Sequence, residues 1–179
     1  SFHKLGFSNR IITSINKIIN KIQKTSTKVH NLTQLCQILG SCYLSTGQVS
    51  ESIKSYEKLQ EISIKLKLKT SLIKSLFNIG ICYIETLERT KAIEYFENII
   101  LIIGEEKIKY KQYIIRGNCC LAFLKSCINC QQESLDLISI IESEIVEFLR
   151  TWVRGYDLLL LGKTYSNLGN MDKSLEMYN

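Results

Sequence analysis

The stretch Asn78–Phe96, NIGICYIETLERTKAIEYF, decides the fold, because its skeleton already occurs forty residues earlier in Ile38–Tyr56, ILGSCYLSTGQVSESIKSY. Each stretch places a glycine, Gly40 or Gly80, three residues before a tyrosine. The charged residues between these positions differ. A skeleton that keeps its spacing while the surface changes indicates an internal repeat.

The repeat extends over the whole chain. A small residue recurs at Gly40, Gly80, Cys120 and Gly162, and a ring follows three positions later at Tyr43, Tyr83, Phe123 and Tyr165. Further downstream come a second small residue and a large apolar one, such as Ala92 and Phe96. We expect a partial unit at 1–27, full units at about 28–68, 69–104 and 105–149, and a truncated last unit at 150–179. In the third unit, Arg116 stands at an apolar position, and we place two extra residues in the turn between the helices.

Apolar residues within each unit recur at helical spacing. One face holds Leu72, Leu76, Ile79 and Tyr83, and a second face holds Ile93, Phe96, Ile100 and Ile103. Two amphipathic helices per unit follow. Only a small residue fits where two helices cross closely, which explains the recurring glycine. Residues 64–72 alternate like a strand, but an isolated strand would have no partner, so we expect helix ends there.

The pattern resembles the tetratricopeptide repeat family, whose signature is W-x2-L-G-x2-Y followed by A-x3-F. The resemblance is carried by Leu76, Ile79, Gly80, Tyr83, Ala92 and Phe96, and by Leu158, Leu161, Gly162, Tyr165, Ser174 and Tyr178. The usual Trp and Pro are absent, and the forty-residue period is similar to that of kinesin light chains and bacterial tandem arrays. The resemblance implies an all-α, right-handed superhelical solenoid of antiparallel helix pairs, one array over residues 1–179.

Composition narrows the class of protein. Of 179 residues 45% are hydrophobic and 22% charged, which is typical of a folded chain. The densest apolar run, Ile99–Ile103, is far shorter than the roughly 18 residues of a membrane span, so we expect no membrane partner. Seven cysteines, an odd number, argue against a secreted disulfide scaffold and predict a cytoplasmic protein. The chain starts at Ser1 and stops at Asn179 inside an apolar pattern, so we interpret it as part of a longer protein.

Charge is unevenly placed. The net charge is +6, but residues 1–75 carry 12 basic and 3 acidic side chains, whereas residues 131–179 carry 4 basic and 8 acidic ones. A basic segment attracts nucleic acid or an acidic partner. Lysines without interleaved aromatic residues are more typical of a solvated helix surface, so a nucleic-acid partner is not expected. The opposite charges at the two ends also predict head-to-tail self-association.

The sequence contains no pattern that supports catalysis. It has no glycine-rich phosphate loop, and neither His3 nor His30 has an acidic or nucleophilic partner at a motif spacing. Cys127 and Cys130 form a lone C-x-x-C, whereas a structural zinc site needs four ligands. We expect no enzymatic activity, cofactor or metal, and leave a redox or metal role of this cysteine pair open.

The resemblance also implies a binding surface, because such solenoids bind partners on the concave side lined by the first helix of each unit. The candidate groove residues are Gln37, Ser41, Lys74, Phe77, Asn78, Ile81, Asn118, Leu121, Lys125, Tyr156 and Lys163. In long-period relatives an Asn just before the Leu-Gly pair bonds the peptide backbone, and Asn78 and Asn118 take that position here. We predict a non-enzymatic scaffold or adaptor module that binds a peptide or partner helix. The alternatives are a sensor or scaffold arm of a larger signalling protein and, less favoured, an RNA-binding helical repeat.

Overall fold

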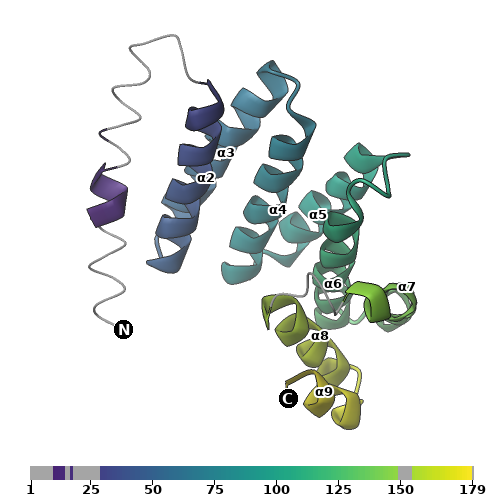
Figure 1. Cartoon of the computed structure of the whole chain (residues 1–179). Coiled ribbons are helices and arrows are strands. Elements are labelled where there is room, and N and C mark those ends of the chain that lie inside the picture. The colour runs from purple at the N-terminus through teal and green to yellow at the C-terminus, as the bar shows by residue number, and fades with distance from the viewer. Residues whose placement is uncertain (1–9, 15–16, 18–28, 149–154, 179) are drawn as a thin grey trace. The chain divides into compact units, whose positions relative to one another are not determined.

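The structure, a computed structural model, describes residues 10–14, 17, 29–148 and 155–178, and its regular elements there are helices. They are α2 (Val29–Ser45), α3 (Val49–Lys65), α4 (Lys69–Glu85), α5 (Arg89–Ile103), α6 (Lys111–Cys127), α7 (Gln131–Phe148), α8 (Gly155–Asn167) and α9 (Met171–Tyr178) (Figure 1). The all-α prediction is confirmed. None of these helices is long and apolar enough to cross a membrane. Of the partial unit, only residues 10–14 and 17 are described, and His3 lies outside them.

The chain forms two compact units, Ser1–Glu88 and Arg89–Asn179. In the first compact unit, α2 packs on α3, and α4 packs on both. Leu39 of α2 is buried with Ile12 from the segment before it. The alternating residues 64–72 form the end of α3, a short connection and the start of α4, as expected. The prediction of one array over 1–179 stays a prediction.

In the second compact unit, Arg89–Asn179, α6 is the central helix, because it contacts α5, α7 and α8. Helix α9 packs on α8. One cluster of the core of this compact unit consists of Ile115, Cys119, Ala122, Ile138, Ile141, Leu161 and Tyr165. The contributing side chains come from α6, α7 and α8, so residues on several sides of α6 are covered. This position of α6 determines which of the predicted groove residues reach the surface.

The same three-residue turn joins the two helices of each pair. Its middle residue has a positive φ in all four described turns: 76° at Gly47, 62° at Leu87, 62° at Asn129 and 79° at Gly169. The next N–H donates to the carbonyl five residues earlier, in the pairs Gln48 to Tyr43, Glu88 to Tyr83, Cys130 to Lys125 and Asn170 to Tyr165, at 2.9, 3.0, 3.0 and 2.9 Å. These turns fix which residues are equivalent between the units.

The turns correct the register predicted for the third unit. A buried serine of the second helix donates to a carbonyl of the first: Ser52 Oγ to Gly40 at 2.8 Å, Ser134 Oγ to Ala122 at 2.8 Å and Ser174 Oγ to Gly162 at 2.9 Å. Ala122 therefore takes the glycine position, and Lys125 takes the tyrosine position. The assignment of Cys120 and Phe123 to these positions was wrong.

The physical reason lies in where the extra residues fall. α5 is two residues shorter than α3, and the connection 104–110 is four residues longer than the connection 66–68, so a net insertion of two residues precedes α6. The turn 128–130 has the same length as the turn 46–48. The predicted insertion inside the third unit's turn was therefore wrong. In the corrected register, Arg116 no longer aligns with the apolar position of the other units. Asn118 aligns with it instead.

We expect Leu87→Gly to raise the stability of the chain by about 0.5–1 kcal/mol. A left-handed conformation of a non-glycine residue costs about 1–3 kcal/mol, part of which glycine loses again through its greater freedom in the unfolded state. The Leu87 side chain is 71% exposed, so little packing is lost. Urea unfolding measures the change. Leu87→Ala is the control, since it removes the same side chain but keeps the strain, and a less stable Gly than Ala variant would contradict this assignment.

Candidate functional site

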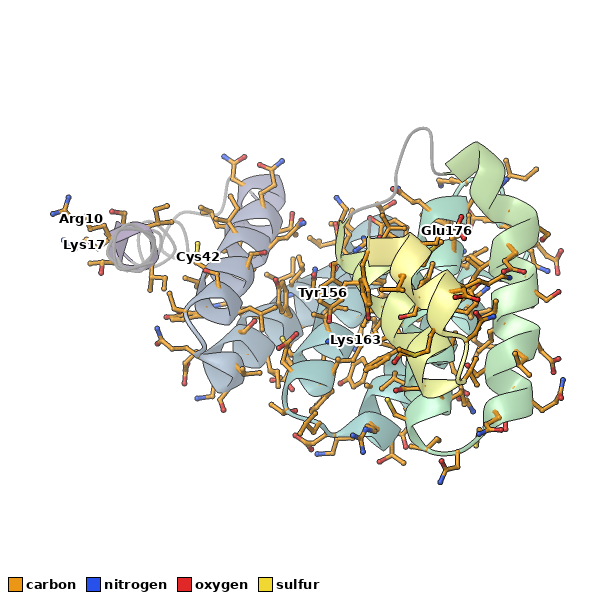
Figure 2. The ribbon with its side chains drawn as sticks, turned by 90° about the horizontal axis from the view of Figure 1, so that it is seen from below. Arg10, Lys17, Cys42, Tyr156, Lys163 and Glu176 are labelled. Atoms are coloured by element: carbon orange, nitrogen blue, oxygen red, sulfur yellow. The ribbon has the colours of Figure 1, made fainter. Side chains whose placement is uncertain are left out.

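One face of α2 lines an open hollow of about 510 Å³. Its described lining consists of Gln34, Gln37, Ile38, Ser41, Cys42 and Ser45. These residues are spaced by one, three or four positions, which places them together on one helix face. Cys42 is labelled on this helix in Figure 2. Gln37 and Ser41, both predicted to line a groove, lie in this wall.

The described wall of the hollow is built from uncharged side chains, and hydrogen-bonding groups stand in a mostly apolar surface. Ser41 Oγ donates to the Gln37 carbonyl at 3.1 Å and lies 3.0 Å from the Tyr56 hydroxyl of α3. Burial raises the pKa of Tyr56 to about 12, so this phenol is neutral at ordinary pH. An amide offers a donor and an acceptor together, and a hydroxyl can serve as either. Such a wall suits the peptide groups of an extended chain better than it suits an ion.

The predicted groove residues of α4 divide into two groups. Phe77 and Ile81 are buried, so the expectation that they face an open groove was wrong. Lys74 and Asn78 are half-buried. Asn78 Nδ2 donates to the Lys74 carbonyl one helical turn earlier, at 2.8 Å. The amide nitrogen of Asn78 is therefore already engaged within its own helix.

The corrected register changes the repeat positions of the predicted groove residues of α6. Asn118 and Leu121 are buried, because α5, α7 and α8 surround their helix. Lys125 Nζ lies 2.7 Å from Glu133 and 3.5 Å from Glu97, and the hydrogen bond that it donates to Glu133 is the largest cause that raises the pKa of Lys125. The position before the Leu-Gly pair belongs to Cys120 in this unit. Of the two asparagines, only Asn78 keeps the position that the resemblance implied.

α8 carries the remaining two groove candidates, half-buried Tyr156 and exposed Lys163, both labelled in Figure 2. Lys163 Nζ lies 5.9 Å from the centre of the Phe123 ring, within the range of a cation–π contact. Asn167 Nδ2 donates to Ser126 Oγ at 3.0 Å. In the corrected register Phe123 and Lys163 correspond to Ser41. In the compact unit Arg89–Asn179, α6 thus presents an aromatic residue and α8 a cation at the position where α2 presents a hydroxyl.

A buried ion pair between α6 and α8 was missed by the sequence analysis. Arg116 Nε donates to both carboxylate oxygens of Asp157, at 3.0 and 3.3 Å. Asp157 is only 1% exposed. The signal in the sequence was an arginine and an acid 41 residues apart, on the first helices of neighbouring repeat units. The sequence analysis missed this signal because the wrong register assigned Arg116 to an apolar position.

The repeat positions named from the sequence are found on the expected helices. Gly40, Gly80, Ala92, Phe96, Cys120, Gly162 and Tyr165 are buried, whereas Tyr43, Tyr83 and Phe123 are half-buried. Gly40 and Gly162 face the rings of Tyr56 and Tyr178 so closely that an added Cβ would lie within 3.0 Å of ring carbons. Close approach of the two helices therefore explains these two glycines, as the sequence predicted.

The cysteines fall into two environments. Cys119 and Cys120 are buried in α6, and burial raises the pKa of Cys119 to about 12 and that of Cys120 well above its ordinary value. Cys127 and Cys130 are half-buried at the ends of the turn between α6 and α7. Within the part of the chain that the structure describes, no group of three or more His, Cys, Asp or Glu side chains could hold a metal ion.

We expect Cys127 and Cys130 to be alkylated in the native protein while Cys119 and Cys120 remain protected. The thiolate is the nucleophile, and Cys119 stays a neutral thiol until the pH approaches its raised pKa of about 12. Iodoacetamide labelling at mildly alkaline pH, read by peptide mass spectrometry with and without urea, measures the difference. Labelling of Cys119 as fast as Cys127 without urea would contradict the described packing.

Comparisons with known proteins agree with the helical repeat described above. Two family models, both described as tetratricopeptide repeat, match residues 33–63 and 158–179 and residues 74–101. These segments fall in the first, second and fourth units. No curated protein sequence matches the chain significantly.

Solved structures of similar fold include nearly identical TPR-like repeats from a Podosopora anserina protein assigned to the kinesin light chains. That structure is 17% identical, with a TM-score of 0.67 over 98% of this chain and 90% of the other. A point variant of the same protein is 16% identical, with a TM-score of 0.67 over 98% and 89%. Three segments of the chain therefore match the tetratricopeptide repeat family, and the fold of the chain is similar to that of these TPR-like repeats.

Proposed function

We propose that this chain is a non-enzymatic protein-binding module that holds an extended peptide of a partner protein in the hollow along α2. The tetratricopeptide repeat is in general a protein-interaction fold, which supports the coarse function. The observation that carries the finer proposal is the described lining of the hollow, in which the amide of Gln37 and the hydroxyl of Ser41 stand beside the apolar side chain of Ile38. The cytoplasmic location inferred from the cysteines belongs to the same proposal.

Peptide groups are the ligand chemistry that this wall matches. Each hydrogen bond between the wall and a peptide contributes about 0.5–1.5 kcal/mol net, so several bonds plus burial of Ile38 give moderate affinity. Ile38 is an exposed apolar side chain in the wall and offers a contact to an apolar side chain of the ligand. The described lining residues are uncharged, so we expect the bonds that they make to a peptide to depend little on salt.

The test is selection of a binding peptide from a displayed random library, followed by affinity measurements on variants. We expect Ser41→Arg to weaken binding at least tenfold, because an arginine at this exposed position fills the hollow. Ser50→Arg is the matched control, since Ser50 is an exposed serine of α3 that does not line the hollow. Equal affinity of the Ser41→Arg variant and the parent would reject the α2 hollow as the binding site.

A further inference from the structure

Helix α2, which lines the hollow, differs in charge from the helices at equivalent repeat positions. Residues 29–50 contain no Asp, Glu, Lys or Arg, and α2 lies entirely within them. Each of the other described first helices, α4, α6 and α8, carries at least two such residues. The described lining of the hollow therefore belongs to a helix that offers a ligand no carboxylate, ammonium or guanidinium group.

The lining residues form two parallel rows along α2, because helix positions four apart lie on the same face. The rows consist of Gln34, Ile38 and Cys42, and of Gln37, Ser41 and Ser45. From the first to the last lining residue the wall extends about 16 Å along the helix axis, at 1.5 Å per position. An extended chain rises about 3.3 Å per residue, so the wall contacts about five residues of an extended ligand.

The row with the two serines offers acceptors more readily than donors. Ser45 Oγ donates to the Cys42 carbonyl at 2.9 Å, and Ser41 Oγ donates to the Gln37 carbonyl at 3.1 Å. A hydroxyl has one proton, so each serine oxygen keeps lone pairs as its remaining bonding capacity. These oxygens match the N–H groups of a ligand and repel a carboxylate, which can only accept.

The other row is apolar at its centre. Ile38 is 48% exposed, and Cys42 one turn later is half-buried. Burial raises the pKa of the Cys42 thiol, so this side chain is neutral at ordinary pH. A charged ligand side chain placed against this row would lose water without gaining an ionic partner, which opposes binding. An aliphatic side chain would instead remove apolar surface from water.

We propose that the hollow is specific for an uncharged segment of a partner protein, in which an aliphatic side chain packs on Ile38 and an Asn or Gln side chain bonds Gln37 and Ser41. This inference rests on the proposed function, because it names the partner chemistry of the same hollow. An amide side chain donates to the Ser41 oxygen and also pairs with the Gln37 amide, since each amide carries both a donor and an acceptor. Ile38 is the specificity-determining residue.

The test is parallel selection from a displayed library of random peptides on the parent chain and on Ile38→Glu. We expect the parent to enrich an uncharged core of about five residues that contains an aliphatic residue and Asn or Gln. Ile38→Glu should enrich Lys or Arg in place of the aliphatic residue, because a carboxylate then stands in the apolar row. Ile64→Glu is the matched control, since Ile64 is an exposed isoleucine of α3 outside the described lining, and it should enrich the same peptides as the parent.

The affinity of one peptide enriched on the parent is then measured with its aliphatic core residue replaced. We expect replacement by Lys and replacement by Glu each to weaken binding to the parent at least tenfold. On Ile38→Glu, the Lys peptide should bind more tightly than the aliphatic peptide. The peptide replacements leave the chain unchanged, so they test the specificity even if a variant of the chain does not fold, which circular dichroism checks.

The outcomes distinguish this inference from the proposed function. The specificity is wrong, while the hollow remains the binding site, if binding is lost in Ser41→Arg but the parent tolerates Lys or Glu in the core. The same holds if Ile38→Glu, once folded, enriches the same peptides as the parent. Both proposals are wrong if no peptide is enriched, or if the enriched peptides bind Ser41→Arg as they bind the parent. Enrichment of acidic cores on the parent would overturn the uncharged partner directly.

Discussion

Gly40→Ala should destabilise the chain by about 1–3 kcal/mol, although alanine is the better helix former by about 1 kcal/mol. The added Cβ would lie 2.6, 2.7 and 2.8 Å from three ring carbons of Tyr56. Tyr56 is buried, so its ring cannot move aside cheaply. The same substitution at Gly117 is the control. An added Cβ there meets nothing within 4 Å, so Gly117→Ala should stabilise the chain by about 0.5–1 kcal/mol.

The third unit suggests the compensating change. It has Ala122 at the position of Gly40 and Ile138 at the position of Tyr56, and both belong to one core cluster. We expect Tyr56→Ile to lower the cost of Gly40→Ala, with a coupling of about 1–2 kcal/mol in a double-mutant cycle read by urea unfolding. Additive effects of the two substitutions would mean that the glycine and the ring do not constrain each other.

Arg116→Met should cost about 3–5 kcal/mol, the second large effect. It leaves the buried carboxylate of Asp157 without the guanidinium that donates to both of its oxygens. Replacing both residues, with Arg116→Met and Asp157→Leu, should restore most of the stability, because no charge is then left buried. Thermal unfolding of the single and double variants measures these changes.

The control for this prediction is an exposed ion pair in the same compact unit, Arg89–Asn179. Lys111 Nζ lies 2.7 Å from Glu144 Oε2 at the surface. Exposed pairs contribute about 0–1 kcal/mol, so Lys111→Met should have little effect. A cost of Arg116→Met no greater than that of Lys111→Met would show that Asp157 is not buried in solution as described.

The fold was predictable because its signals repeat. Gly40 and Gly80 share a spacing with Tyr43 and Tyr83, and helical periodicity within each unit gave the two amphipathic helices. The strand-like alternation of residues 64–72 was correctly set aside, because an isolated strand would have had no partner. The third unit was misaligned because glycine and tyrosine, the two residues that fix the register, are both replaced there. The turn at Asn129, whose positive φ matches that of Gly47, was the signal that would have placed it.

The candidate site was less predictable, because a residue's face on a helix does not determine its exposure. Phe77 and Leu121 are on their helices as expected, yet their side chains are buried. Gln37 and Ser41 were assigned to a peptide groove from the repeat, and both line the α2 hollow, whose role as that groove stays a proposal. The ion pair between Arg116 and Asp157 depends on contact between helices of neighbouring units, which no local pattern contains.

The measurement that tests the central claim most directly is photo-crosslinking of a selected peptide to the chain, with the adducts mapped by mass spectrometry. The account predicts adducts on α2 between Gln34 and Ser45, and their loss in Ser41→Arg but not in Ser50→Arg. Adducts confined to the outer face of α3 or to the connection 66–68, unchanged in Ser41→Arg, would contradict the assignment of the α2 hollow as the peptide-binding surface.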